Sequence, residues 1–102
     1  MITYARALRI VDELRRRGLK AEIVGGIYKK KDVLHDIDLI TREKNAPKDI
    51  AIIKSIRTTT PIELYVTSTE HYLGLRRALR ATTYAAIQGR LMKGLRFKRM
   101  TL

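Results

Sequence analysis

Apolar positions near the start of the chain recur every three or four residues, the spacing of a helix with one buried side. On that side, between residues 3 and 17, lie Ala7, Leu8, Val11 and Leu14. Gly18 follows three consecutive arginines, an arrangement typical of a helix C-terminus. The pattern therefore predicts an amphipathic helix, and we expect its apolar side to cover a sheet.

Short runs rich in β-branched residues follow this helix and predict strands. The expected strands are Lys20–Val24, His35–Thr41 and Ile62–Thr67, with a polar loop at Arg42–Lys48. Residues 49–57 are ambiguous, but the four isoleucines in this segment favour a further strand. Joined by a turn at Thr58–Pro61, that strand would form a hairpin with Ile62–Thr67.

After Ser68 the chain becomes basic and helical in pattern. Ser68 or Thr69 fits a helix N-cap. The expected elements are a helix to about Arg80, a second helix at 82–93, and a final strand or extended tail at 95–102. This predicts an α+β fold: a small mixed or antiparallel sheet with helices on one face in residues 1–67, and a small basic helical lobe in residues 68–102.

Composition narrows the class of partner. The chain has 102 residues, with 22 Lys and Arg against 10 Asp and Glu, so its formal net charge is +12. Such a charge favours a polyanionic partner, nucleic acid before a membrane surface, although a highly soluble or heat-adapted surface is the alternative. The absence of cysteine excludes disulfides and cysteine-ligated zinc or iron–sulfur sites. Neither a secretory signal nor a membrane-spanning run is recognisable, so we expect a soluble, cytoplasmic protein without a membrane partner.

Two aspartates in the second expected strand are candidates for chemistry. Asp36 and Asp38 are two residues apart, so a strand would project both on one face while Ile37 and Leu39 point to the core. Neighbouring carboxylates repel each other unless a cation lies between them, and Mg²⁺ prefers such oxygen ligands. The alternative is that both are exposed strand residues paired with nearby lysines.

Two further features accompany the aspartates. Gly25 and Gly26 end the preceding strand, where they would let backbone N–H groups approach a bound anion. Glu63 lies in the strand Ile62–Thr67 and would converge with Asp36 and Asp38 if the two strands are neighbours. Three carboxylates on one face are what a two-metal site needs.

In this order of motifs the sequence resembles the DNA polymerase beta-type nucleotidyltransferases, polymerase family X. That family has an apolar strand, Gly-Ser or Gly-Gly, a gap of nine to thirteen residues, Asp-apolar-Asp, and a third acidic residue on a later strand. Here nine residues separate Gly26 from Asp36, and Glu63 is the third acid. The tail at residues 92–102 also resembles the Lys-Gly-apolar-x-apolar end of the family, so the likeness covers nearly the whole chain.

The resemblance implies roles for individual residues. Asp36 and Asp38 would bind two Mg²⁺ ions, for which Mn²⁺ could substitute. Glu63 would complete the site of the catalytic ion and help accept the proton of the primer hydroxyl. Gly25, Gly26 and Lys29 would bind the triphosphate of a deoxynucleotide or ribonucleotide. The implied activity is metal-dependent nucleotidyl transfer to the 3′ end of DNA or RNA.

The sequence also departs from the family. Gly26 stands where serine is usual, Glu63 is longer than the usual aspartate, and the Thr-Gly segment that reads the sugar is not recognisable. These departures bear on efficiency and sugar selectivity. For contact with the nucleic-acid backbone, the basic residues of the C-terminal part are the candidates: Arg76, Arg77, Arg80, Arg90, Lys93, Arg96, Lys98 and Arg99.

Two other functions fit the same sequence. One is a minimal nucleotidyltransferase of the toxin–antitoxin kind, which modifies protein or RNA; those enzymes usually carry Gly-Ser-x-x-Arg-Gly where this chain has Gly25–Lys30. The other is a nucleic-acid-binding module that keeps the fold and has lost turnover. Its basic charge supports this reading, whereas three retained carboxylates argue against it.

Overall fold

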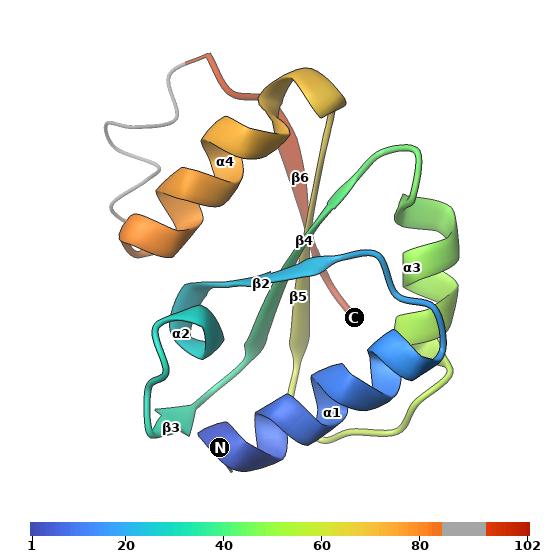
Figure 1. Cartoon of the computed structure of the whole chain (residues 1–102), viewed down its shortest axis with the longest axis vertical. Coiled ribbons are helices and arrows are strands. Elements are labelled where there is room, and N and C mark those ends of the chain that lie inside the picture. The colour runs from blue at the N-terminus through green and yellow to red at the C-terminus, as the bar shows by residue number, and fades with distance from the viewer. Residues whose placement is uncertain (85–93) are drawn as a thin grey trace.

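The computed structural model describes residues 1–84 and 94–102 (Figure 1). Its elements are β1 (Ile2–Thr3), α1 (Tyr4–Arg16), β2 (Glu22–Val24), α2 (Gly25–Tyr28), β3 (Val33–Leu34), β4 (Ile37–Arg42), α3 (Ala46–Lys54), β5 (Ile62–Thr67), α4 (Thr69–Ala81) and β6 (Phe97–Thr101). The predicted α+β class is thus confirmed in this part of the chain.

The main sheet has the strand order β2-β4-β5-β6. β4 and β5 are parallel, while β2 and β6 run antiparallel to their neighbours. In this register Asp38 lies between Val24 of β2 and Glu63 of β5. A separate pair, β1 with β3, ties the start of the chain to the segment before β4. The sheet is therefore mixed, and it places two of the predicted acids side by side.

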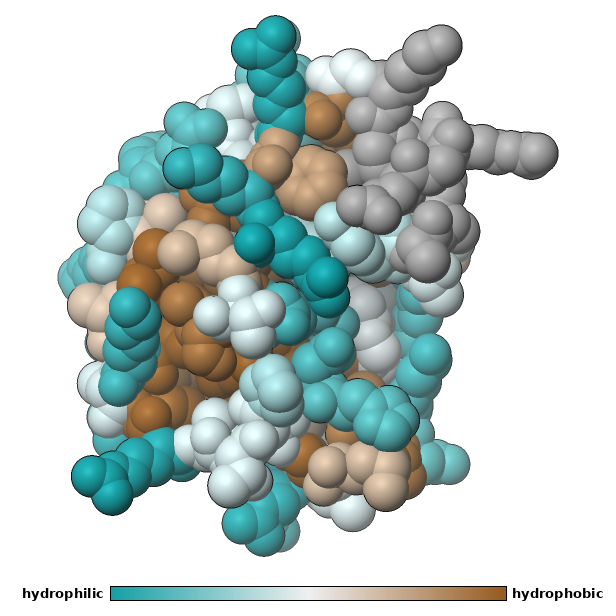
Figure 2. Space-filling model, turned by 180° about the vertical axis from the view of Figure 1, so that it is seen from behind, coloured by the Kyte–Doolittle hydropathy of each residue, from teal (hydrophilic) through white to brown (hydrophobic). Residues whose placement is uncertain are grey.

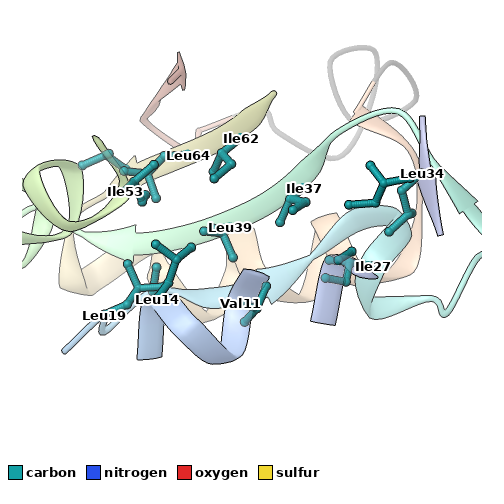
Figure 3. Packing of buried hydrophobic residues seen from close by; sticks show 14 of the residues in the cluster. Val11, Leu14, Leu19, Ile27, Leu34, Ile37, Leu39, Ile53, Ile62 and Leu64 are labelled. Atoms are coloured by element: carbon teal, nitrogen blue, oxygen red, sulfur yellow. The ribbon is translucent and has the colours of Figure 1, made fainter. Parts of the chain in front are cut away.

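Helices cover both faces of the main sheet, and the helix on the second face belongs to residues 68–102, which were predicted as a separate lobe. α1 and α3 pack on one face, and α4 packs on the other (Figure 1). Figure 3 shows the first core, to which β4 contributes Ile37 and Leu39 and β5 contributes Ile62 and Leu64. The second core joins Ile40 and Tyr65 to residues of α4. The alternation of faces along β4 and β5 supplies both cores.

α1 forms as predicted. Thr3 is its N-cap and accepts a hydrogen bond from the amide of Arg6 at 3.3 Å. Val11 and Leu14 are fully buried in the first core, and each such side chain contributes roughly 1.5–3 kcal/mol by leaving water. Gly18, with a φ of +99°, takes the left-handed conformation that ends the helix.

α3 is a helix where a strand and hairpin were predicted, so that prediction was wrong. Pro47 lies in its first turn, where a missing N–H costs nothing, and not in a loop. Ala46, Asp49 and Ile53 are buried at helical spacing. The helix connects β4 to β5, and because such a crossover returns the chain in the same direction, the two strands pair in parallel.

The expected strand His35–Thr41 is divided in two. Val33 and Leu34 pair with β1, and β4 begins only at Ile37. Asp36 therefore lies in the bend before β4 rather than on the strand. After the first short strand the chain forms the single helical turn α2.

The carboxyl-terminal part adds one helix and one strand to the sheet. Ser68 caps α4 and accepts from the amide of His71 at 3.3 Å, as predicted. The predicted final strand is β6, which pairs with β5 at the edge of the sheet. Most of the expected helix at 82–93 lies outside the described residues. The separate lobe at 68–102 stays a prediction, and its last strand belongs to the main sheet.

Hydrophobic residues reach the surface on one side. Figure 2, seen from behind, shows them gathered in the middle of that face with hydrophilic side chains around them. Met100 and Leu102, at the end of the chain, are only partly buried against the first core.

None of the helices formed by the described residues is both long and apolar enough to cross a membrane.

Candidate functional site

A cleft of about 230 Å³ lies where β4 begins, and we call it the aspartate cleft. Its walls come from α2, the segment before β4, the end of α4 and β6. The lining includes Gly25, Gly26, Lys29, Asp36, Asp38, Tyr65 and Arg99. Five of the six residues predicted for catalysis or nucleotide binding therefore lie around one space.

The side chains of Asp36 and Asp38 lie close together in the lining of the cleft. Burial raises the pKa of Asp38 to about 7, and the neighbouring carboxylate of Asp36 acts in the same direction. The positive charge of Arg99 acts against them. A cation bound between the two side chains would offset the repulsion that raises the pKa of Asp38.

The backbone at Gly25 lies directly against the side chain of Asp38. Its φ is +63°, and a Cβ added to it would lie 2.3 Å from Oδ2 of Asp38. A side chain at this position would occupy the space of the carboxylate. The glycine that the sequence motif singled out is therefore required by Asp38 itself.

Gly26 is confined by a different neighbour. A Cβ at this position would lie 2.8 Å from Cδ2 of Leu34, which is buried in the first core. Serine, usual here in the family that the sequence resembles, would need Leu34 to move. The departure from the family pattern thus has a packing cause in this chain.

Glu63 lies next to Asp38 in the register of β5 against β4 and is only 7% exposed. Its two carboxylate oxygens accept hydrogen bonds from Oγ1 of Thr101 at 3.0 and 2.9 Å. Nε of Arg99 is 3.5 Å from Oε2 of the same side chain. β6 therefore holds the carboxylate of Glu63 from the side opposite β4.

The predicted acidic residues meet only part of what a hard divalent ion requires of its ligands. Asp36 and Asp38 form a close pair of carboxylates, and a cation between them would offset the repulsion that raises the pKa of Asp38. Over residues 1–84 and 94–102, however, no three His, Cys, Asp or Glu side chains are grouped so as to hold a metal ion. Glu63 would have to exchange its contacts with β6 to join the two aspartates.

Arg99 is the residue whose place sequence reasoning missed. It was predicted to contact a nucleic-acid backbone, yet it lines the aspartate cleft and its guanidinium lies 4.3 Å from the ring centroid of Tyr84. The ring of Tyr65 is 5.9 Å from the same group. The sequence could have predicted that Arg99 lines the cleft only if the pairing of β6 with β5 had been known.

The other predicted basic residues are dispersed. Arg76 pairs with Glu22 at 2.9 Å, and Nε of Arg80 donates to the carbonyl of Ile23 at 3.1 Å. Arg77, Arg96 and Lys98 are exposed, and Arg90 and Lys93 lie outside the described residues. Because Lys98 and Arg99 are consecutive in β6, they point to opposite faces of the sheet. The predicted contacts with nucleic acid stay predictions.

The chain matches no protein-family model, and comparisons with curated proteins and with solved structures found no match either. What can be inferred about its activity therefore depends on the residues of the aspartate cleft.

Proposed function

We propose that this chain transfers a nucleotidyl group from a nucleoside triphosphate to the 3′ end of a nucleic acid, in the manner of a minimal family X DNA polymerase. One observation carries the proposal. Asp36 and Asp38 line one cleft, in which the backbone at Gly25 leaves room only for the carboxylate of Asp38. A site shaped around two repelling carboxylates supports a role for those carboxylates with a cation.

In this reaction the 3′ hydroxyl oxygen attacks the α-phosphorus, a new P–O bond forms, and the bond to the leaving pyrophosphate breaks. Asp36 and Asp38 would hold Mg²⁺, or Mn²⁺ in its place. Bound there, two such ions would stabilise the charge that develops on the phosphoryl oxygens and the leaving group. The chain itself orients the two carboxylates and keeps Asp38 largely out of water.

Glu63 and the basic residues of the cleft have separate roles in this proposal. Glu63 would accept the proton of the attacking hydroxyl once its carboxylate leaves Thr101. Lys29 and Arg99, which both line the cleft, would offset the charge of the triphosphate. The contact between Arg99 and Glu63 would then be exchanged for one with the nucleotide.

A second candidate function is a nucleic-acid-binding module without turnover. The contacts of Glu63 with Thr101 and Arg99 favour it, because a carboxylate that is already satisfied is a poor ligand for an ion. Metal-dependent addition separates the two candidates.

The experiment is primer extension with Mg²⁺ or Mn²⁺ on single-stranded, primed and gapped DNA, with deoxynucleotides and ribonucleotides in parallel. Asp38→Asn keeps the shape of the side chain and is expected to abolish addition. Asp12→Asn, an exposed change on α1, is the matched control and should retain it. Absence of addition by the wild type on every substrate, with DNA binding unchanged in Asp38→Asn, would leave the binding module.

A further inference from the structure

A second hollow surface lies along α1, outside the aspartate cleft. Two adjoining pockets of about 790 and 590 Å³ share Arg6, Arg9, Ile10 and Arg57. They follow α1 on one side and the segment from Ser55 to Thr60 on the other. We call this surface the α1 groove.

The α1 groove carries uncompensated positive charge. Arg6, Arg9 and Arg57 are exposed, and within the part of the chain that the structure describes their guanidinium groups form no ion pair. The acid that lines the groove is Glu13, which is bound by Arg16 at 3.0 Å and Arg17 at 2.9 Å. The groove therefore presents three arginines whose charge no neighbouring carboxylate offsets.

The two walls of the groove are fixed to each other. Nη1 of Arg17 donates to the carbonyl oxygen of Ser55 at 3.1 Å and to its Oγ at 3.0 Å. Beyond this link, the hydroxyl-bearing residues Thr58, Thr59 and Thr60 line the opposite wall. Arginines facing threonine hydroxyls and backbone amides are the groups that proteins use to bind phosphodiester oxygens.

One wall of the groove is joined by a backbone hydrogen bond to the start of β4, the strand that carries Asp38. The loop that forms its wall leads through Pro61 into β5, and the carbonyl oxygen of Pro61 accepts from the amide of Ile37 at 2.9 Å. Ile37 is the residue between Asp36 and Asp38. In Figure 1 the amino terminus, the start of α1 and β3 lie at this same end of the molecule. A strand bound in the groove would thus arrive at the end of the sheet that carries the cleft.

We propose that the α1 groove binds the sugar-phosphate backbone of a nucleic-acid strand through Arg6, Arg9 and Arg57. The charge, the hydroxyl groups and the approach to the aspartate cleft favour this occupant over an acidic protein or an anionic membrane. That the strand is the acceptor whose 3′ end is extended rests on the proposed function; that the groove binds a backbone does not.

The test compares two triple variants of equal charge. Arg6→Ala/Arg9→Ala/Arg57→Ala removes the three arginines of the groove that form no ion pair, and Arg15→Ala/Lys44→Ala/Lys48→Ala removes three exposed charges elsewhere, so each carries +12 − 3 = +9. Binding of fluorescent single-stranded DNA is measured by anisotropy over a range of salt, after thermal melts establish that both variants are folded. Loss of three phosphate contacts should lower the slope of log K against log salt by about 2 and weaken binding about tenfold or more at low salt.

The control variant should keep most of the wild-type affinity and slope. Equal losses in both variants, or none in the groove variant, would overturn the proposal. Vesicles containing phosphatidylserine serve as a second ligand: a groove variant that loses vesicle binding but keeps DNA binding would assign the groove to a membrane and overturn it as well.

A second readout separates this proposal from the proposed function. If the wild type adds nucleotides, the groove variant should raise KM for the acceptor at least severalfold and leave KM for the nucleotide unchanged. Equal changes in both constants would contradict the acceptor assignment. If the wild type adds nothing, the proposed function fails, and the binding comparison still decides whether the groove holds a strand.

Discussion

A Cβ at Gly25 would lie 2.3 Å from Oδ2 of Asp38, so the backbone of α2 and the carboxylate of β4 occupy adjoining space with no room for a side chain. The glycine also has a φ of +63°, which other residues adopt only with strain. The two features of the sequence motif, the paired glycines and the paired aspartates, are therefore one packing unit in the structure.

Gly25→Ala is expected to destabilise the chain by more than the roughly 1–2 kcal/mol that a left-handed conformation costs an alanine, because the new methyl group also collides with Asp38. Urea unfolding followed by circular dichroism measures the change. Gly74→Ala is the control, since a Cβ there meets only Cδ2 of Leu95 at 3.6 Å and alanine favours the helix.

The excess cost of Gly25→Ala should shrink in an Asp38→Ala background, where the colliding oxygen and Cγ are absent. The remainder would come from the positive φ. Equal destabilisation by Gly25→Ala in both backgrounds would show that the carboxylate of Asp38 does not confine position 25.

Gly26→Ser introduces the serine that is usual in the family the sequence resembles, and we expect it to reduce stability because the new Cβ would lie 2.8 Å from Cδ2 of Leu34. Leu34→Val shortens that neighbour. The double variant should therefore be more stable than the sum of the two single changes predicts, by about 0.5–3 kcal/mol. Strict additivity of the three unfolding free energies would contradict this account.

The positions of the candidate site residues were predicted better than the connection between the strands β4 and β5. Ile62 and Leu64 of β5 pack into the first core, while Tyr65, on the other face of the strand, packs into the second core, because side chains alternate between the two faces of a strand. The helix at Ala46–Lys54 was missed because its isoleucines favour strands locally, whereas packing on the first core favours the helix. Pro47, read as a loop residue, was the available signal for the helix start.

The contacts made by the side chains of β6 could not be predicted from the sequence. Arg99 reaches Glu63 and the ring of Tyr84 only because β6 pairs with β5, and strand neighbours distant in sequence are not encoded in local spacing. The predicted contact of Arg99 with nucleic acid rested on charge alone. Its position in the aspartate cleft follows from topology.

Asp49 is a buried carboxylate that holds α3 in place. Its Oδ1 accepts from the amide of Lys20 at 2.9 Å, and its Oδ2 accepts from Oγ1 of Thr41 at 2.7 Å. Asp49→Ala should cost about 1–3 kcal/mol, since it leaves the buried hydroxyl of Thr41 unpaired. Asp49→Asn should cost less, because the hydroxyl can rotate to accept from the new amide. Chemical unfolding of both variants measures the difference, and an equal loss would contradict it.

The pKa of Asp38 gives the stability of the metal-free chain a pH dependence of known sign. In the unfolded chain this carboxyl has a pKa near 3.8, and burial with the charge of Asp36 raises it to about 7 in the fold. Between these values the folded chain binds the extra proton, so stability falls as pH rises. The contribution is fully present below about pH 3.8 and is lost as pH rises through about 7.

Thermal melts in chelator, from pH 4 to 8, should therefore show the melting temperature of the wild type falling relative to that of Asp38→Asn, which cannot ionise. Comparing the two proteins cancels the titration of their common groups. At pH 8, Mn²⁺ or Mg²⁺ should raise the melting temperature of the wild type more than that of the variant, because a cation bound by Asp36 and Asp38 would offset the charge of the ionised Asp38. Parallel pH curves for the two proteins would show that Asp38 is not held protonated by burial. Equal shifts with the cation would show that the pair does not bind it.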